Sequence, residues 1–144
     1  MGSSMTSHRF IPRDWLPIKL WHMEPGQPFE VASEVIYSNQ LMRLVIPPGF
    51  RCDLSSIPSW LRWVPGFAVS GLNARAALIH DFLYAVQIVD REIADAIFLS
   101  VMKADGVGWF ARTAMYLAVR AFGGTAWREN RSDPKKLGGT AELK

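Results

Sequence analysis

A run of apolar residues between Ala74 and Gln87 constrains the fold more than any other part of the chain. Its central part reads AALIHDFLYAV. At helical spacing these residues are apolar on nearly every side, which indicates a helix buried on most sides rather than a surface helix with one apolar stripe. A second helix is predicted from Arg91 to Lys103, with Asp90 as its N-cap and Gly106 at its end. Together these two predicted helices form a buried helical hairpin.

A turn near Ile88 sets the register of this hairpin. Antiparallel helices pack with their axes roughly 8–10 Å apart, so an imidazole and a carboxylate at the same level can meet. The register places His80 opposite Asp95. Tyr84 lies one turn after His80 on the same face. Asp81 points to another side, because adjacent helical residues diverge by about 100°.

His80, Asp95 and Tyr84 are therefore candidate catalytic residues. A neutral imidazole can accept a proton from water while a carboxylate on its far nitrogen fixes the tautomer, which is the arrangement of a general base. The alternative is structural, since a buried polar group left alone costs about 1–3 kcal/mol and a His–Asp pair satisfies both partners. An exposed ion pair with Arg91, one turn away, would also explain Asp95.

Asp81 and Asp53 are candidate metal ligands, because carboxylate oxygens suit hard divalent cations. The alternative is that Asp53 braces its loop through backbone N–H groups and that Asp81 anchors this loop. Cys52 adjoins the loop and is the only cysteine, which excludes an intramolecular disulfide and every multi-cysteine metal site. A lone cysteine is more often a small buried hydrophobe than a reactive thiol.

The first fifty residues favour strands. Phe29–Tyr37 and Leu41–Ile46 predict a β-hairpin around a polar turn, and Ile18–Met23 is a candidate third strand. A short helix is predicted at 59–64, and a longer one at Trp109–Phe122. The fold class is therefore α+β: a small N-terminal antiparallel β-sheet followed by a bundle of three to four helices that includes the buried hairpin.

The 144 residues, 49% of them hydrophobic, suffice for one domain with a real core. We expect a flexible leader at 1–9, one α+β domain at 10–127, and a mobile or partner-ordered tail at 128–144, which is charged and poor in aliphatic residues. The net charge of +3 weakly favours an anionic or lipid ligand, but the basic residues are scattered along the chain, so a solvated surface is the alternative. The sequence contains no clear nucleic-acid motif. No transmembrane segment or signal peptide is predicted.

Four motifs that follow one another from about Pro47 to Gly123 resemble a family of uncharacterised phage and prophage proteins. They are Pro48-Gly49-Phe50-Arg51-x-Asp53-Leu54-x-Ser56-Ile57-Pro58, Ala74-Arg75-Ala76-Ala77-x-Ile79-His80-Asp81-x-Leu83-Tyr84, Ala94-Asp95-x-x-Phe98 and Met115-Tyr116-x-Ala118-Val119-Arg120. The resemblance implies a phage or prophage origin and no established activity. We therefore expect a virion component of the tail or head, with other phage structural proteins as partners, located in the virion or the host cytoplasm.

A second resemblance covers only the hairpin. Ala76-x-x-x-His80-Asp81-x-x-Tyr84, followed by Ala94-Asp95-x-x-Phe98, looks like the helix pair of phospholipase A2 of the parvoviral type. It implies that His80 is the general base, that Asp81 binds calcium and that Asp95 orients the histidine. The span from His80 to Asp95 is shorter than in that family. The alternative function is thus a hydrolase, phospholipase-like and assisted by a divalent cation such as calcium.

Overall fold

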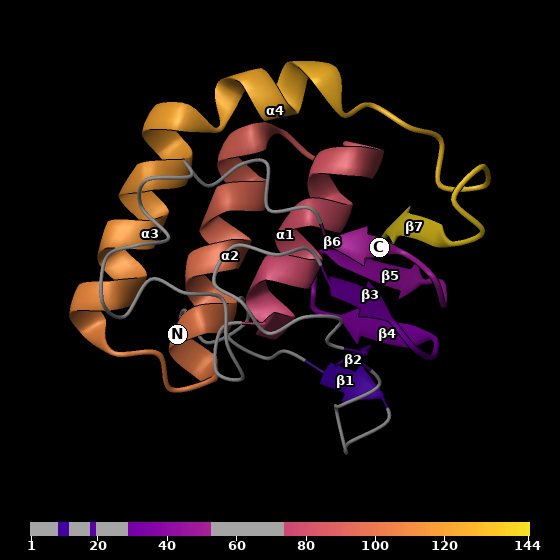
Figure 1. The fold of residues 1–144 in the computed structure, drawn as a ribbon, viewed down its shortest axis with the longest axis horizontal. Helices are drawn as coiled ribbons and strands as arrows, with labels where there is room; N and C mark the ends of the chain where they lie inside the picture. Colours follow the sequence, from indigo (N-terminus) through magenta and orange to yellow (C-terminus); the bar gives the residue numbers. More distant parts are fainter. Residues whose placement is uncertain (1–8, 12–17, 20–28, 53–73) are drawn as a thin grey trace.

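The computed structural model describes residues 9–11, 18–19, 29–52 and 74–144 (Figure 1). Two small antiparallel sheets precede a group of four helices, and the chain then returns to the first sheet. The α+β fold predicted from the sequence is confirmed. The predicted helix at 59–64 and the candidate ligand Asp53 lie outside the described residues.

The first sheet has the strand order β1-β4-β5-β7. Its strands are β1 (Arg9–Ile11), β4 (Val35–Ser38), β5 (Met42–Ile46) and β7 (Thr140–Leu143). The predicted hairpin is β4–β5, with Val35 opposite Ile46. Asn39 builds its turn, because the Asn39 Oδ1 accepts the Leu41 and Met42 N–H groups at 2.8 and 2.9 Å.

The second sheet has the order β2-β3-β6, formed by β2 (Ile18–Lys19), β3 (Phe29–Val31) and β6 (Arg51–Cys52). The prediction of one strand over Phe29–Tyr37 was therefore wrong, since β3 and β4 belong to different sheets. The intervening residues 32–34 are all exposed, so they break the alternation that a half-buried strand requires. Part of the expected third strand is present as β2.

The helices form a layer beside the sheets (Figure 1). They are α1 (Ala74–Val86), α2 (Arg91–Ala104), α3 (Trp109–Phe122) and α4 (Gly124–Glu129). The bounds of α1, α2 and α3 differ from the predicted bounds by at most one residue at either end. Helix α1 lies between α2 on one side and the sheets on the other. This position explains why nearly all of its residues are apolar.

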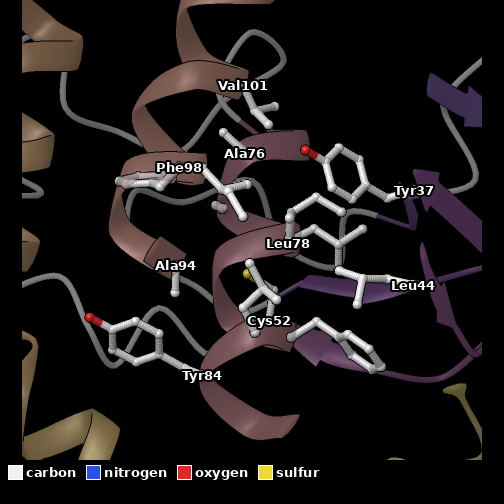
Figure 2. Packing of buried hydrophobic residues seen from close by; sticks show 14 of the residues in the cluster. Tyr37, Leu44, Cys52, Ala76, Leu78, Tyr84, Ala94, Phe98 and Val101 are labelled. Carbon is white, nitrogen blue, oxygen red and sulfur yellow. The ribbon is translucent and has the colours of Figure 1, made fainter. Parts of the chain in front are cut away.

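The core lies where α1 meets the strands. Figure 2 shows Tyr37 and Leu44 from the sheet on one side of α1, near Leu78, and Phe98 of α2 on the opposite side of this helix. Cys52 is fully buried in this cluster, as expected for a lone structural cysteine. Among the described residues, no helix is both long and apolar enough to cross a lipid bilayer.

Strand β7 lies in the segment 128–144, for which the sequence pattern predicted no strand. It pairs with β5, and its end is held by the Lys144 N–H, which donates to the Leu41 carbonyl at 2.9 Å. Gly139 permits the approach, because a Cβ there would collide with the Val45 carbonyl oxygen and lie 2.9 Å from the Pro47 Cδ. Whether a short segment forms a strand depends strongly on its neighbours in the sheet, so the composition of this segment did not reveal the pairing with β5.

Candidate functional site

The hairpin places His80 and Tyr84 of α1 against Asp95 in the second turn of α2. The His80 Nε2 lies 2.7 Å from the Asp95 Oδ1, and the Tyr84 hydroxyl donates to the same oxygen at 2.7 Å. The predicted register is thus confirmed, and both side chains of α1 meet one carboxylate. Their spacing of one helical turn stacks them on one face, with ring centroids 4.2 Å apart.

The other carboxylate oxygen faces arginines. The Arg120 Nη1, from α3, donates to the Asp95 Oδ2 at 2.8 Å, and the Arg91 Nη1 lies 3.8 Å from the same oxygen. Arg91 also donates to the Val119 carbonyl at 3.2 Å near the end of α3. We call His80, Tyr84, Asp95 and Arg120 the Asp95 cluster. It joins three helices through one carboxylate.

The Asp95 cluster is enclosed. His80 is 1% exposed, Asp95 is 0% exposed, and the His80 ring also packs against Phe98 with centroids 4.6 Å apart. The surface ion pair with Arg91 is therefore the wrong explanation for Asp95, because the carboxylate lies inside the protein. An enclosed carboxylate without partners would be strongly unfavourable, so the hydrogen bonds are needed for folding.

The charges in the cluster follow from these contacts. Burial by itself raises the pKa of Asp95, but hydrogen bonds from His80, Tyr84 and Arg120 outweigh burial and leave this pKa below its ordinary value. Asp95 is therefore ionised at neutral pH. A carboxylate only accepts, so the hydrogen shared with His80 is carried by the Nε2.

Burial lowers the pKa of His80 below its ordinary value, although Asp95 acts in the opposite direction. The imidazole is thus neutral at pH 7, and a proton can be added only at its Nδ1. Burial, together with the hydrogen bond to Asp95, raises the pKa of Tyr84. Its phenol therefore stays protonated and acts as a donor that orients the carboxylate.

This arrangement has two chemical interpretations. A neutral histidine with a carboxylate on its Nε2 is the form in which a general base acts through its Nδ1. The enclosure of His80 and the full set of donors around Asp95 also satisfy every requirement of a structural polar cluster. The contact between His80 and Asp95 is established, and the catalytic roles of His80, Asp95 and Tyr84 stay predictions.

Asp81 lies apart from the Asp95 cluster, as the helical geometry predicted. It is 7% exposed and lines a cavity of about 130 Å³ between α1, β6 and the C-terminal segment. Within residues 9–11, 18–19, 29–52 and 74–144, no group of three or more His, Cys, Asp or Glu side chains could hold a metal ion. The pairing of Asp81 with Asp53 as metal ligands stays a prediction, because Asp53 lies outside those ranges.

Arg120 is the member of the cluster that sequence reasoning missed. It belongs to the motif around Met115 to Arg120, but nothing in a single sequence says which helix packs against the back of the hairpin. A usable signal was present, because a buried aspartate requires a cation and α3 carries only Arg112 and Arg120. Of the two, only Arg120 lies near the end of α3 that faces Asp95.

The known proteins to which this chain is similar are themselves described as uncharacterised. The "Uncharacterized protein y4jT" of Sinorhizobium fredii (strain NBRC 101917 / NGR234) is 30% identical over 102 residues, which make up 69% of this chain and 30% of that relative. The chain thus spans less than a third of the length of the curated relative that it matches. No solved structure is significantly similar. A family model matches residues 29–119, from β3 into α3, and the chain therefore belongs to the family described as "Protein of unknown function (DUF1353)".

Proposed function

We propose that this chain is a phage-encoded virion component of the tail or head that contacts other phage structural proteins through the outer face of α3. The observation that carries the proposal is the exposure of large apolar side chains on this one helix. Trp109 is 68% exposed and Leu117 is 58% exposed. Two further exposed side chains of α3 are Phe110 and Phe122.

The pattern of α3 differs from that of an ordinary surface helix. Its buried residues are Met115, Ala118 and Val119, which pack towards α2. Phe110 and Leu117 are seven residues apart, which places them two turns apart on one outward stripe. A solvated helix normally presents charged residues there, and a concentration of exposed apolar side chains on one element is typical of an interaction surface.

In this proposal the Asp95 cluster has a structural role. Its carboxylate links α1, α2 and α3, so it fixes the position of the helix that carries the exposed residues. An interaction protein needs such rigidity, since ordering a loose surface on binding costs affinity. The resemblance to phage and prophage proteins supplies the expected setting.

Mass spectrometry of purified particles tests this proposal. We expect the chain in particles made by the phage or prophage that encodes it, and its absence from them would overturn the virion role. A sharper test supplies variants to particles lacking the gene. The double variant Trp109→Ser with Leu117→Ser should fail to be incorporated, whereas Ala121→Ser, an exposed control on the same helix, should be incorporated like the wild type.

The hydrogen bond between the His80 Nε2 and Asp95 favours a second candidate, a hydrolase. In that function the His80 Nδ1 takes a proton from water as the water attacks an ester carbonyl, and Asp95 stabilises the imidazolium. The imidazolium then returns the proton to the leaving alkoxide as the ester C–O bond breaks, which yields a carboxylic acid and an alcohol. Tyr84 and Arg120 hold the carboxylate in place. Asp81 would hold a divalent cation such as calcium, which would polarise the ester. The phospholipase A2 resemblance of the hairpin makes phospholipid the first substrate to try.

Release of fatty acid from phospholipid vesicles in the presence of calcium tests this candidate. Wild type should turn over, and His80→Ala should lose activity while retaining its fold by circular dichroism. Arg112→Gln serves as a control, because Arg112 lies on α3 and donates to the Val107 carbonyl outside the Asp95 cluster. No turnover by a well-folded wild type would remove the phospholipase version.

A further inference from the structure

The cavity that contains Asp81 has charges of both signs in its wall. It has a volume of about 130 Å³, and a water molecule in the liquid occupies about 30 Å³, so there is room for roughly four waters or a ligand of a few heavy atoms. Its lining residues are Phe50, Arg51, Asp81, Ala85, Asn130, Ser132 and Leu137. These come from β6 and the turn before it, from α1, and from the segment that follows α4.

The lining offers recognition groups for two opposite charges. The Asp81 carboxylate has about four acceptor positions, so it can accept a ligand ammonium in addition to contacts within the protein. Arg51 has a planar guanidinium that can bind a carboxylate or phosphate with two hydrogen bonds. Asn130 and Ser132 can each donate and accept. A ligand with one positive and one negative group matches this wall better than an ion of either sign.

The wall is held in place by contacts on both sides. The Ser132 N–H donates to the Ala85 carbonyl at 2.6 Å, which ties the C-terminal segment to α1. The Phe50 ring packs edge to face against Phe82 with centroids 5.3 Å apart. Since these residues are already ordered, binding of a small ligand would cost little additional conformational entropy.

We infer that this cavity binds a small zwitterion, with the ammonium at Asp81 and the anionic group at Arg51. The inference does not depend on the virion role. The zwitterion is a rival to the divalent cation that the hydrolase candidate would place at Asp81, and Arg51 disfavours that cation because a guanidinium in the same wall repels it. Two sources share the required chemistry: a free α-amino acid, and the phosphoethanolamine headgroup of a lipid.

The experiment is a titration of the full-length, isotopically labelled chain, followed by the backbone amide signals of Ala85 and Ser132. The two probes are L-alanine and phosphoethanolamine. At least one should shift both amides with a dissociation constant below about 1 mM, a modest affinity for a ligand of six to eight heavy atoms. The probe that binds more tightly identifies the source.

Single-charge analogues and variants make the result decisive. Ethylamine and propionate each lack one charge and should bind at least about tenfold more weakly than the zwitterion. Arg51→Gln, at an exposed position where folding should be unaffected, should weaken binding by a similar factor. Arg43→Gln, an exposed arginine of β5 outside the cavity, should leave it unchanged. Asp81→Asn gives a second variant with the same shape.

Three outcomes would overturn the inference. The first is that neither zwitterion shifts the two amides. The second is that the zwitterions bind no more tightly than ethylamine or propionate, or bind Arg51→Gln as well as wild type. The third is that calcium shifts the same amides with a lower dissociation constant than either zwitterion, which would assign the cavity to a metal ion.

Discussion

Helices α1 and α3 depart from the usual helix pattern in opposite directions. Helix α1 carries His80 and Asp81 into the interior, whereas α3 carries Trp109 and Leu117 out to solvent. The polar groups of the Asp95 cluster are satisfied within the molecule by named partners at 2.7–2.8 Å. Trp109 and Leu117 are largely exposed, and under the proposed function a partner protein would cover them.

This difference separates stability from interaction. Changes in the Asp95 cluster should reduce the free energy of unfolding, because they leave buried charges or donors without partners. Changes on the outer face of α3 should leave that free energy nearly unaltered. Strong destabilisation by changes on the outer face of α3, or no destabilisation by changes in the Asp95 cluster, would contradict this separation.

The largest expected effect belongs to Asp95→Ala. It leaves the His80 N–H, the Tyr84 hydroxyl and the Arg120 guanidinium without their shared acceptor, so the free energy of unfolding should fall by about 3–5 kcal/mol. Urea denaturation measures this loss. Glu92→Ala is the comparison on the same helix, since the Glu92 side chain is 83% exposed and its ion pair with Arg120, at 3.8 Å, is a surface one whose loss should cost less than about 1 kcal/mol. Equal losses for the two variants would contradict the structural importance of the cluster.

The pH dependence of stability should report on His80. Burial lowers the pKa of His80 in the folded protein below the unfolded value of about 6.5. Below that pH the histidine is therefore protonated in the unfolded chain but still neutral in the folded chain. The contribution of neutral His80 to the free energy of unfolding is therefore fully present above that pH. It decreases as the pH drops, by at most about 1.4 kcal/mol per pH unit. His80→Gln, which cannot titrate, should be less pH-dependent between pH 7 and 5 in urea denaturation. An unchanged slope would show that His80 is solvated.

The same reasoning places the contribution of Asp95 at lower pH. Its pKa is depressed in the folded protein, so its stabilisation is present above the unfolded pKa of about 3.9 and is lost as the pH falls through the folded value. The loss of stability from His80 begins near pH 6.5, above the pH at which Asp95 begins to lose its stabilisation. A loss of stability between pH 7 and 5 that differs between wild type and His80→Gln therefore belongs to the histidine.

A smaller effect is expected for Tyr84→Phe. The substitution removes one donor to the Asp95 carboxylate and keeps the ring, which packs edge to face on Trp127. The free energy of unfolding should fall by about 1 kcal/mol, the net worth of a typical hydrogen bond. Tyr37→Phe on β4 is the comparison, because the Tyr37 hydroxyl accepts from the Asn39 amide at 3.0 Å, a neutral contact outside the cluster, and the loss should be smaller than for Tyr84→Phe. Denaturation midpoints compare the two, and a larger loss for Tyr37→Phe would count against the assignment.

The smallest effect on stability is expected for Leu117→Ser. The side chain is largely exposed, so the free energy of unfolding should change by no more than about 0.5 kcal/mol. Thermal and urea denaturation provide the measurement. A loss above about 2 kcal/mol would mean that Leu117 is packed in the native protein, and α3 would then be an ordinary core helix rather than an interaction surface.

Much of the fold was predictable because local patterns dominate it. The bounds of α1, α2 and α3 follow from apolar periodicity and from the residues at their ends, such as Asp90 and Gly123. The β4–β5 hairpin follows from alternation and from Asn39 in its turn. The split between β3 and β4, and strand β7, were not predictable in this way, because sheet pairing joins residues far apart in the sequence.

The sequence by itself determined that His80 and Asp95 meet, because a short turn between two helices fixes their register. It also determined that Asp81 faces elsewhere, because adjacent helical residues diverge. Only the tertiary structure decided that Arg120 completes the cluster and that the imidazole is enclosed. It alone also brought Arg51 and Ser132 to the cavity beside Asp81. The physical reason is that burial and long-range pairing depend on which elements pack together, and local spacing carries no record of that choice.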